Sequence, residues 1–326
     1  MRAYLGVDGG GSKTRFLLID DSGKVLADHT EGPAYYLETG LPTLSAMLTH
    51  GIGQVLGRAG IGTHDLGFAF FGIPAYGEDS SLLATLDALP SAALPPERYR
   101  CGNDMICGWA GALAGEDGIN VVAGTGSIAY GEHRGRQARA GGWGELFSDE
   151  GSAYWLAREG LRLFSRMSDG RTARGPLYAL VRRHFELEQD LDLCAAIYGK
   201  DAAQRSRFAL LSKIVAEAAD AGDGAARGLF TQAARELADL IDAVRRSLEV
   251  DQRLEVQVSC TGGLFGLRNL LLEPLALALA STGRPYRLVS ARLPPEAGAA
   301  LYAARLGGAP LGADSLARLE GRLRRS

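Results

Sequence analysis

The segment YLGVDGGGSKTRFLLIDDSGKVL, residues 4–26, places three glycines and Ser12-Lys13-Thr14 between two apolar runs. A P-loop needs Gly directly before Lys and a helix directly after the loop. Here Ser12 precedes Lys13, and the following RFLLID is apolar and leads into an Asp-Asp-Ser-Gly turn. This pattern predicts a second strand, not a helix. The segment is therefore predicted to be strand, glycine-rich turn, strand, and it is not a P-loop.

A glycine-rich turn between strands can still hold phosphate. Glycine tolerates positive φ and lets main-chain N–H groups approach an anion, and successive N–H groups form a concave anion site. Gly10, Gly11, Ser12 and Lys13 are therefore candidate phosphate-binding residues. Asp8 ends the first strand, where its carboxylate is a candidate Mg²⁺ ligand through water. For this segment alone, a plain β-hairpin is the alternative.

The composition describes a soluble globular chain of about two domains. The 326 residues are 46% hydrophobic and 22% charged with net charge −3, and the pI is near 6.0. No basic cluster predicts nucleic-acid binding, and no apolar run reaches the ~18 residues of a membrane span. The 4 cysteines and 5 histidines show no metal-ligand spacing. With no signal-peptide pattern, we expect a cytoplasmic protein without structural zinc, nucleic-acid partner or membrane partner.

The strand–turn–strand pattern occurs again at GINVVAGTGSIAYGE, residues 118–132. Gly124, Thr125 and Gly126 lie between its two apolar runs and are candidate phosphate-binding residues. A triphosphate has to be held from both sides, and two such turns can do this. The second turn makes a nucleotide site the favoured interpretation of the first.

A third apolar run ends in glycines at LEVQVSCTGGLFGLRNLL, residues 254–271. A helical pattern follows Gly262 and Gly263, and the bare backbone leaves room for a purine and its ribose. Ala, Leu and Arg at helical spacing predict helices over most of residues 149–250. The other elements predicted from periodicity and turns are strands at about 67–73 and 97–101, and helices at about 41–59 and 104–114, after Glu78 and after Pro294-Pro295.

The order of the three glycine motifs resembles the actin, Hsp70 and sugar-kinase superfold, in which the halves of a duplicated fold clamp ATP. The resemblance implies an α/β protein with a duplicated ribonuclease H-like (actin-like ATPase) fold and two domains around a nucleotide cleft. We expect an N-terminal domain at 1–116 and a larger C-terminal domain at 117–326. The helical segment at about 149–250 would be an insert in the second domain, and the last residues can return to the first.

Within this superfold the chain is similar to N-acetylglucosamine kinases and the wider BadF-type ATPase family. The motifs that carry the similarity are CGNDMICGWAGAL (101–113), GGWGELFSDEGSAYW (141–155) and PPEAGAALYAA (294–304), and the resemblance covers nearly the whole chain. It implies a homodimeric kinase that uses ATP and Mg²⁺ to phosphorylate the 6-hydroxyl of an amino sugar. N-acetylglucosamine is the expected acceptor, and glucosamine is the alternative.

The resemblance implies a catalytic role for Asp104 and a sugar-binding role for both Asp104 and Asp149. Asp104 is expected to contact the sugar and accept its hydroxyl proton, although in local sequence it is also a candidate helix N-cap. Asp149 is expected to bind sugar hydroxyls, with capping as its alternative. The other sugar-binding residues implied are Ser127, Ile128, Gly142, Trp143 and Gly144.

The roles of Gly222 and Tyr35 stay open. Gly222, beside Asp223, is expected to border the adenine, or else belongs to a turn between helices. Family members usually carry Gly-Pro-Ala/Ser-Asn at the sugar-facing loop, whereas EGPAYYLETG (31–40) places Tyr35 at the Asn position. Tyr35 is retained as a sugar-binding candidate. A phenol is longer and stiffer than an amide, so the pocket shape must differ and the acceptor stays open.

Two other functions are weighed against the kinase. The family includes ATPases that activate 2-hydroxyacyl-CoA dehydratases through a shared iron–sulfur cluster, which needs grouped cysteines. Cys101, Cys107, Cys194 and Cys260 offer no such grouping. A nucleotide-dependent switch without an acceptor would hydrolyse ATP slowly whatever sugar is present.

Overall fold

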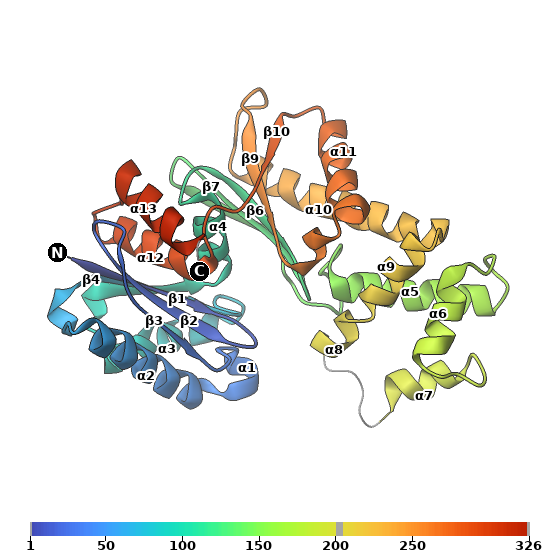
Figure 1. The fold of residues 1–326 in the computed structure, drawn as a ribbon, viewed down its shortest axis with the longest axis horizontal. Helices are drawn as coiled ribbons and strands as arrows, with labels where there is room; N and C mark the ends of the chain where they lie inside the picture. The colour runs from blue at the N-terminus through green and yellow to red at the C-terminus, as the bar shows by residue number, and fades with distance from the viewer. Residues whose placement is uncertain (1, 200–204, 325–326) are drawn as a thin grey trace. The chain divides into compact units, whose positions relative to one another are not determined.

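The computed structural model describes residues 2–199 and 205–324. The chain divides into two compact units (Figure 1): Met1–Asp117 with Ser290–Ser326, and Gly118–Val289. The first division lies one residue beyond the boundary expected at 116. The segment from Ser290 onward is grouped with the first unit, which is the return that the resemblance allows for the last residues, and the second unit ends at Val289.

The first unit is built on a mixed five-stranded sheet of order β3-β2-β1-β4-β5. Strands β1, β2 and β3 pair antiparallel, whereas β1–β4 and β4–β5 pair parallel. The strands are β1 (Ala3–Gly9), β2 (Thr14–Asp20), β3 (Val25–Glu31), β4 (Leu66–Ile73) and β5 (Tyr99–Asn103).

Helices cover both faces of this sheet (Figure 1). Leu5 and Phe16 point to the face packed against α2, in a core with Leu44 of that helix. Gly6 points to the other face because strand side chains alternate. A Cβ at Gly6 would lie 2.1 Å from the backbone N of Ala300, so only glycine lets α12 pack this closely. The helices are α1 (Tyr36–Thr39), α2 (Leu41–Ala59), α3 (Leu83–Ala88), α4 (Met105–Leu113), α12 (Pro295–Leu306) and α13 (Ala313–Leu323).

The second unit repeats this plan. Its five-stranded sheet has the order β10-β9-β6-β7-β8, with β6, β7 and β8 antiparallel and β6–β9 and β9–β10 parallel. Read in reverse, as β8-β7-β6-β9-β10, this sheet has the same sequence of antiparallel and parallel pairs as β3-β2-β1-β4-β5 of the first unit. This match confirms the expected duplicated α/β fold. The strands are β6 (Gly118–Ala123), β7 (Ser127–His133), β8 (Arg136–Gly141), β9 (Val256–Thr261) and β10 (Tyr286–Val289).

Helices fill the segment between β8 and β9, where a helical insert is predicted. The long helix α10 packs on β6, β7 and β8, and α5 and α9 pack beside it around a core that contains Phe164 and Phe230. None of the helices in the described part of the chain combines the length and apolarity needed to cross a membrane. The helices of this segment are α5 (Ala153–Ser168), α6 (Pro176–His184), α7 (Asp192–Tyr198), α8 (Arg205–Ala209), α9 (Ser212–Asp220) and α10 (Gly224–Ser247), and α11 (Glu273–Ser281) lies between β9 and β10.

The parallel strands fix where the candidate residues lie. Ligands of α/β proteins bind outside the carboxyl ends of parallel strands. In the first unit the ends of β1, β4 and β5 share one edge, which carries the turn after Gly9 and the start of α4. In the second unit the ends of β6 and β9 share an edge, which carries the turn at 124–126 and Gly262.

Candidate functional site

The turn between β1 and β2 is exposed and held by backbone hydrogen bonds. Gly10 N donates to Lys13 O (3.1 Å), and Ala34 N donates to Gly10 O (2.9 Å). Gly11, Ser12 and Lys13 are exposed, as a phosphate turn requires. Neither Gly10 nor Gly11 has a positive φ, so that reason for glycine is wrong here. The reason at Gly10 is space, because a Cβ would lie 2.9 Å from Lys13 O.

Asp8 lies on the face of β1 that α12 covers, opposite Arg15 on β2 and Gly72 on β4. Desolvation raises the pKa of Asp8 well above its usual range, and the carboxylates of Asp104 and Glu296 raise it further. Arg15 opposes this shift but also forms an ion pair with Glu296 (2.8 Å). None of the described residues donates a hydrogen bond to the Asp8 carboxylate.

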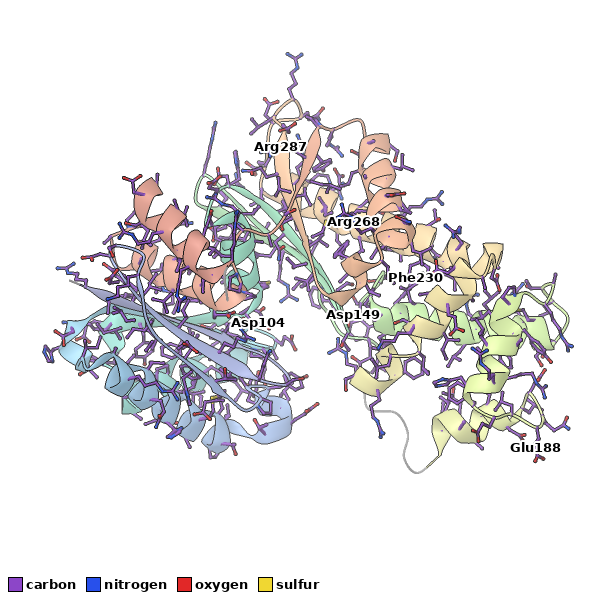
Figure 2. The ribbon with its side chains drawn as sticks, in the orientation of Figure 1. Asp104, Asp149, Glu188, Phe230, Arg268 and Arg287 are labelled. Carbon is purple, nitrogen blue, oxygen red and sulfur yellow. The ribbon has the colours of Figure 1, made fainter. Side chains whose placement is uncertain are left out.

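Asp104 stands where β5 ends and α4 begins (Figure 2). Gly72 makes room for it, since a Cβ there would lie 3.1 Å from Asp104 Cα and 2.2 Å from Cys107 Sγ. Its side chain makes no capping hydrogen bond. Instead, Asn103 Oδ1 accepts from Met105 N (3.1 Å). Desolvation raises the pKa of Asp104 to about 6, so this carboxyl is available for chemistry near neutral pH.

Asp149 precedes α5 in the second unit and is only 2% exposed (Figure 2). Its φ is +59°, and its Oδ1 accepts from Ser127 N (3.3 Å). It forms an ion pair with Arg205, whose Nε also contacts Glu145 Oε2 (2.9 Å). Ser152, not Asp149, caps α5 by accepting from Trp155 N (3.1 Å). The capping alternative for Asp149 is therefore wrong.

The turn between β6 and β7 is bonded to the start of α5. Ala153 N donates to Gly124 O (2.9 Å) and Tyr154 N donates to Thr125 O (3.2 Å). Gly126 packs against Asp149, whose Oδ2 would lie 2.7 Å from a Cβ at this position. These contacts place the phosphate-turn candidates and Asp149 in one cluster of the second unit. The Ser127 hydroxyl belongs to it as well, because it donates to Glu150 O (2.7 Å).

The segment after β8 contains an exposed aromatic residue, Trp143. Gly142 and Gly144 have φ of +70° and +97°, and Trp143 between them is 67% exposed. The Trp143 ring lies 5.4 Å from the Arg139 guanidinium carbon. Gly142 packs on Ile128, whose Cδ1 would lie 2.7 Å from a Cβ at 142. Trp143 is thus not a core residue, and its ring is available to a ligand.

A cavity of about 750 Å³ opens beside the β6–β7 turn. This volume is in the range of small-molecule sites. Of the sequence-predicted residues it brings together Gly124, Thr125 and Gly263. Gly262 does not line the cavity. Its φ is +102°, and a Cβ here would lie 2.4 Å from Ala123 O, so the backbone conformation and packing at this position require glycine. The other lining residues are Ala153, Ser206, Ala209, Leu210, Ser212, Lys213, Ala216, Glu217, Asp220, Leu264 and Leu267.

Gly222 does not line this cavity either. It has a φ of +89° in the short connection between α9 and α10. The next residue, Asp223, caps α10 by accepting from Ala225 N and Ala226 N, both at 3.0 Å. These contacts favour the interhelical-turn interpretation.

Some residues that line the cavity or contact Asp149 were not predicted from the sequence. Lys213, Glu217 and Asp220 stand on one side of α9 at spacings of four and three, a signal that helical periodicity could have found. Arg205 pairs with Asp149 across 56 positions of sequence, which no local pattern reveals.

Tyr35 is half-buried in the first unit and packs partly against the core under the sheet. Its neighbour Tyr36 is buried and donates a hydrogen bond to Ala75 O (3.3 Å). Tyr35 thus follows Ala34, whose N–H bonds this loop to the β1–β2 turn at Gly10 O.

The chain is similar to known proteins in sequence and in fold. Over 309 residues the chain is 26% identical to an N-acetyl-D-glucosamine kinase of Dictyostelium discoideum, covering 92% of this chain and 97% of that protein. It is 29% identical to an N-acetylmuramic acid/N-acetylglucosamine kinase of Clostridium acetobutylicum, over 84% and 89% of the two chains. A crystal structure from Chromobacterium violaceum, provisionally assigned as an N-acetylglucosamine kinase, superposes with a TM-score of 0.70 at 27% identity, over 92% and 98%. The model of the BadF/BadG/BcrA/BcrD ATPase family matches residues 5–303, and the chain belongs to that family.

Proposed function

We propose that this protein is an ATP-dependent hexosamine kinase that phosphorylates the 6-hydroxyl of an amino sugar, with N-acetylglucosamine as the first candidate. One observation carries the proposal: Asp104 is a desolvated carboxyl with a pKa near 6 that does not cap its helix. A nucleotide-dependent switch needs no such base. The kinase relatives and the cavity beside the β6–β7 turn support the same function.

In the proposed reaction, Asp104 accepts the proton of the sugar hydroxyl as that oxygen attacks the γ-phosphorus and ADP leaves. The turns at 10–13 and 124–126 bind the phosphates through backbone N–H groups. Adenosine occupies the cavity bordered by Gly263. Asp149 and the segment 142–144 bind the sugar, and the Arg205 ion pair holds the Asp149 carboxylate in place.

The residues around Asp8 fit a magnesium ion. Mg²⁺ prefers carboxylate and water oxygens, and three carboxylates gather here while none of the described residues bonds that of Asp8. When bound, Mg²⁺ would neutralise charge on the transferring phosphate. Asp8 would hold it through water. Homodimer formation and a cytoplasmic location stay predictions, and light scattering of the purified protein tests the first.

The acceptor is tested by measuring ADP release with ATP and a panel of sugars. We expect the highest kcat/KM with N-acetylglucosamine or glucosamine, and lower values with N-acetylmannosamine, N-acetylmuramic acid and glucose. Glucosamine is the second candidate because Tyr35 replaces the usual Asn. ADP release that no sugar accelerates would contradict the kinase. The dehydratase-activator alternative is not favoured, since Cys101 and Cys107 are buried, Cys260 is partly buried, and burial raises the pKa of all three thiols.

Tyr35→Asn is expected to change the ratio of kcat/KM for N-acetylglucosamine over glucosamine by at least about tenfold. An amide offers two donors and an acceptor on a short arm, whereas a phenol offers one hydroxyl at the end of a ring. The KM for ATP should stay nearly unchanged. Tyr35→Phe is the matched control that keeps the ring. A ratio within about twofold of wild type for Tyr35→Asn would show that Tyr35 does not contact the sugar.

The activity should depend on pH through Asp104. A general base works only when deprotonated, so kcat/KM should fall about tenfold per pH unit below the pKa of about 6 and level off above it. Initial rates between pH 5 and 8.5 at saturating ATP, with folding monitored at each pH, measure this profile. A flat profile down to about pH 5 would exclude Asp104 as the base with this pKa.

A further inference from the structure

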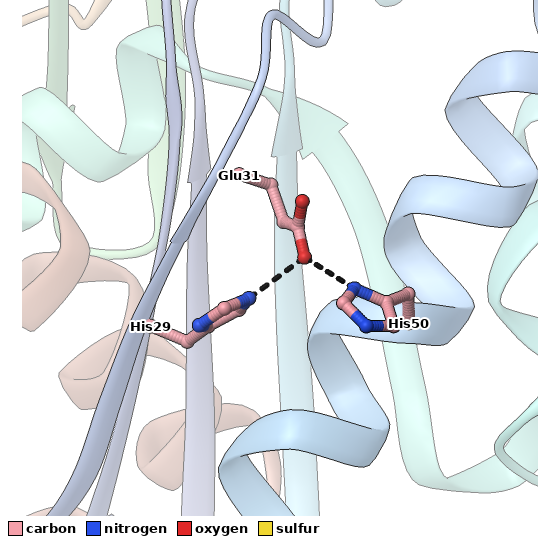
Figure 3. Close-up of side chains that lie close together, drawn as sticks. All are labelled: His29, Glu31 and His50. Atoms are coloured by element: carbon pink, nitrogen blue, oxygen red, sulfur yellow. Dashed lines mark hydrogen bonds and ion pairs between the residues drawn. The ribbon is translucent and has the colours of Figure 1, made fainter.

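Three potential metal ligands meet where β3 ends, outside the proposed kinase site (Figure 3). Glu31 Oε1 lies 2.7 Å from His29 Nε2 and 2.6 Å from His50 Nδ1. All three ligand atoms lie within 4.8 Å of one another. The histidines show no ligand spacing in the sequence, because the fold brings His50 to the strand from α2.

Rigid elements position these side chains. His29 and Glu31 are two residues apart on β3, so they point to the same face of the strand. The helix α2, which carries His50, packs against that face. The His29 and Glu31 side chains are 14% and 19% exposed, and that of His50 is 61% exposed. The cluster is therefore fixed on the protein side and open to solvent at His50.

We propose that His29 Nε2, Glu31 Oε1 and His50 Nδ1 bind a borderline divalent cation, with Zn²⁺ as the first candidate. Two imidazoles and a carboxylate are a known zinc ligand set, with Zn–N and Zn–O distances of about 2.0–2.2 Å. Ligands of a tetrahedral zinc lie about 3.3 Å apart, so the His29–Glu31 and Glu31–His50 contacts, at 2.7 and 2.6 Å, must each open by about 0.6–0.7 Å. The exposed His50 side chain can supply this movement at its own contact. A rotation of the Glu31 carboxylate about its soft terminal torsion can supply it at His29. Water fills the fourth position.

At His50 the surroundings can also accept the change of tautomer that binding requires. In the hydrogen-bonded cluster each histidine donates an N–H to Glu31, and in the metal-bound form that proton sits on the other ring nitrogen. For His50 this nitrogen is Nε2, which lies 3.2 Å from the Gln54 side-chain nitrogen. A flip of the Gln54 amide presents its oxygen as the acceptor. Such an outer partner orients a metal-bound histidine.

An ion here would join β3 to α2 at the start of the loop that leads to Tyr35. Thr14 Oγ1 donates to Gly32 O (2.8 Å), and Ala34 N donates to Gly10 O (2.9 Å). The residues directly after Glu31 are thus bonded to the β1–β2 turn. The metal would stabilise the first unit at this point, and it is distinct from the Mg²⁺ proposed at Asp8.

The test is a competition titration with Zn²⁺ and a chelating dye, on the full-length protein carrying Cys194→Ser to remove an exposed thiol. We expect one zinc bound per chain and a zinc-dependent rise of the melting temperature. His50→Ala and Glu31→Gln should each weaken binding at least about 30-fold. His64→Ala is the matched control, because His64 is an exposed histidine of the same unit whose Nε2 lies 3.3 Å from Asp65 Oδ2 and which does not belong to the cluster. It should bind zinc like the parent.

Cobalt substitution tests the ligand type. Co²⁺ bound by nitrogen and oxygen should give visible ligand-field bands without thiolate charge-transfer absorption, and His50→Ala should abolish those bands. Mg²⁺ in excess should not displace the zinc, since Mg²⁺ disfavours imidazole. The proposal is overturned if the parent binds no zinc at micromolar concentration, if His64→Ala weakens binding as much as His50→Ala, or if cobalt shows thiolate absorption.

Discussion

Asp104→Asn is expected to lower kcat by about 10²- to 10⁴-fold and to leave ATP binding near normal. Asn has nearly the same shape as Asp but cannot accept the hydroxyl proton. The fold should be preserved because the Asp104 side chain makes no capping bond. Its raised folded-state pKa also means that ionised Asp104 costs stability above pH 6. The melting temperature of the variant at pH 8 should therefore be equal or higher.

Turnover is measured by ADP release at saturating sugar and ATP, and ATP affinity by calorimetry without sugar. Asp314→Asn is the matched control, since Asp314 is an exposed carboxylate in the first turn of α13. It should leave both quantities unchanged. If Asp104→Asn kept more than half of the wild-type turnover, Asp104 would not be the base, and the proton would have to leave through another group.

The glycine turns at Gly10 and Gly124 were predictable from sequence because each lies between two apolar runs that form neighbouring strands. The apolar runs around Gly10 and Gly124 alternate with turns, and those patterns give β1–β2 and β6–β7. Helix α2 was predicted at its observed bounds, Leu41–Ala59, because its apolar residues recur at helical spacing and Gly60 ends it. The local pattern left Asp104 open between cap and base. Only the structure shows that the Asp104 side chain does not cap α4 and that Asn103 Oδ1 accepts from Met105 N.

Other elements carry no comparable local signal. The strand β8 reads RQARAG, which is polar because it lies at the edge of the second sheet. The opposite edge strand, β10, has only four residues and owes its strand state to pairing with β9. The His29–Glu31–His50 cluster and the Arg205–Asp149 pair depend on tertiary packing. Sequence periodicity reports the face that a residue occupies but not its partner across the fold.

Gly263→Val is expected to raise the KM for ATP at least about 100-fold, or about 2.8 kcal/mol. Gly263 lines the cavity, has no positive φ, and has nothing within 4 Å of an added Cβ. The fold can therefore accept valine, whose methyl groups would occupy space proposed for the ribose and adenine. The KM for the sugar should change little, because the sugar contacts are assigned to other residues. Initial rates at varied ATP measure the effect, and calorimetry with ADP checks it without turnover.

Gly266→Val is the matched control for this change. Gly266 ends the same short helix, also has open space around an added Cβ, and does not line the cavity, so its ATP affinity should stay within about twofold of wild type. Gly262 is unsuitable because its positive φ and the close Ala123 carbonyl would make any side chain destabilising. Equal melting temperatures for the two valine variants, with affinity lost only in Gly263→Val, assign the cavity to the nucleotide. If Gly263→Val bound ATP normally, the nucleotide would have to bind elsewhere, and the interpretation of the Gly262-Gly263 motif would be wrong.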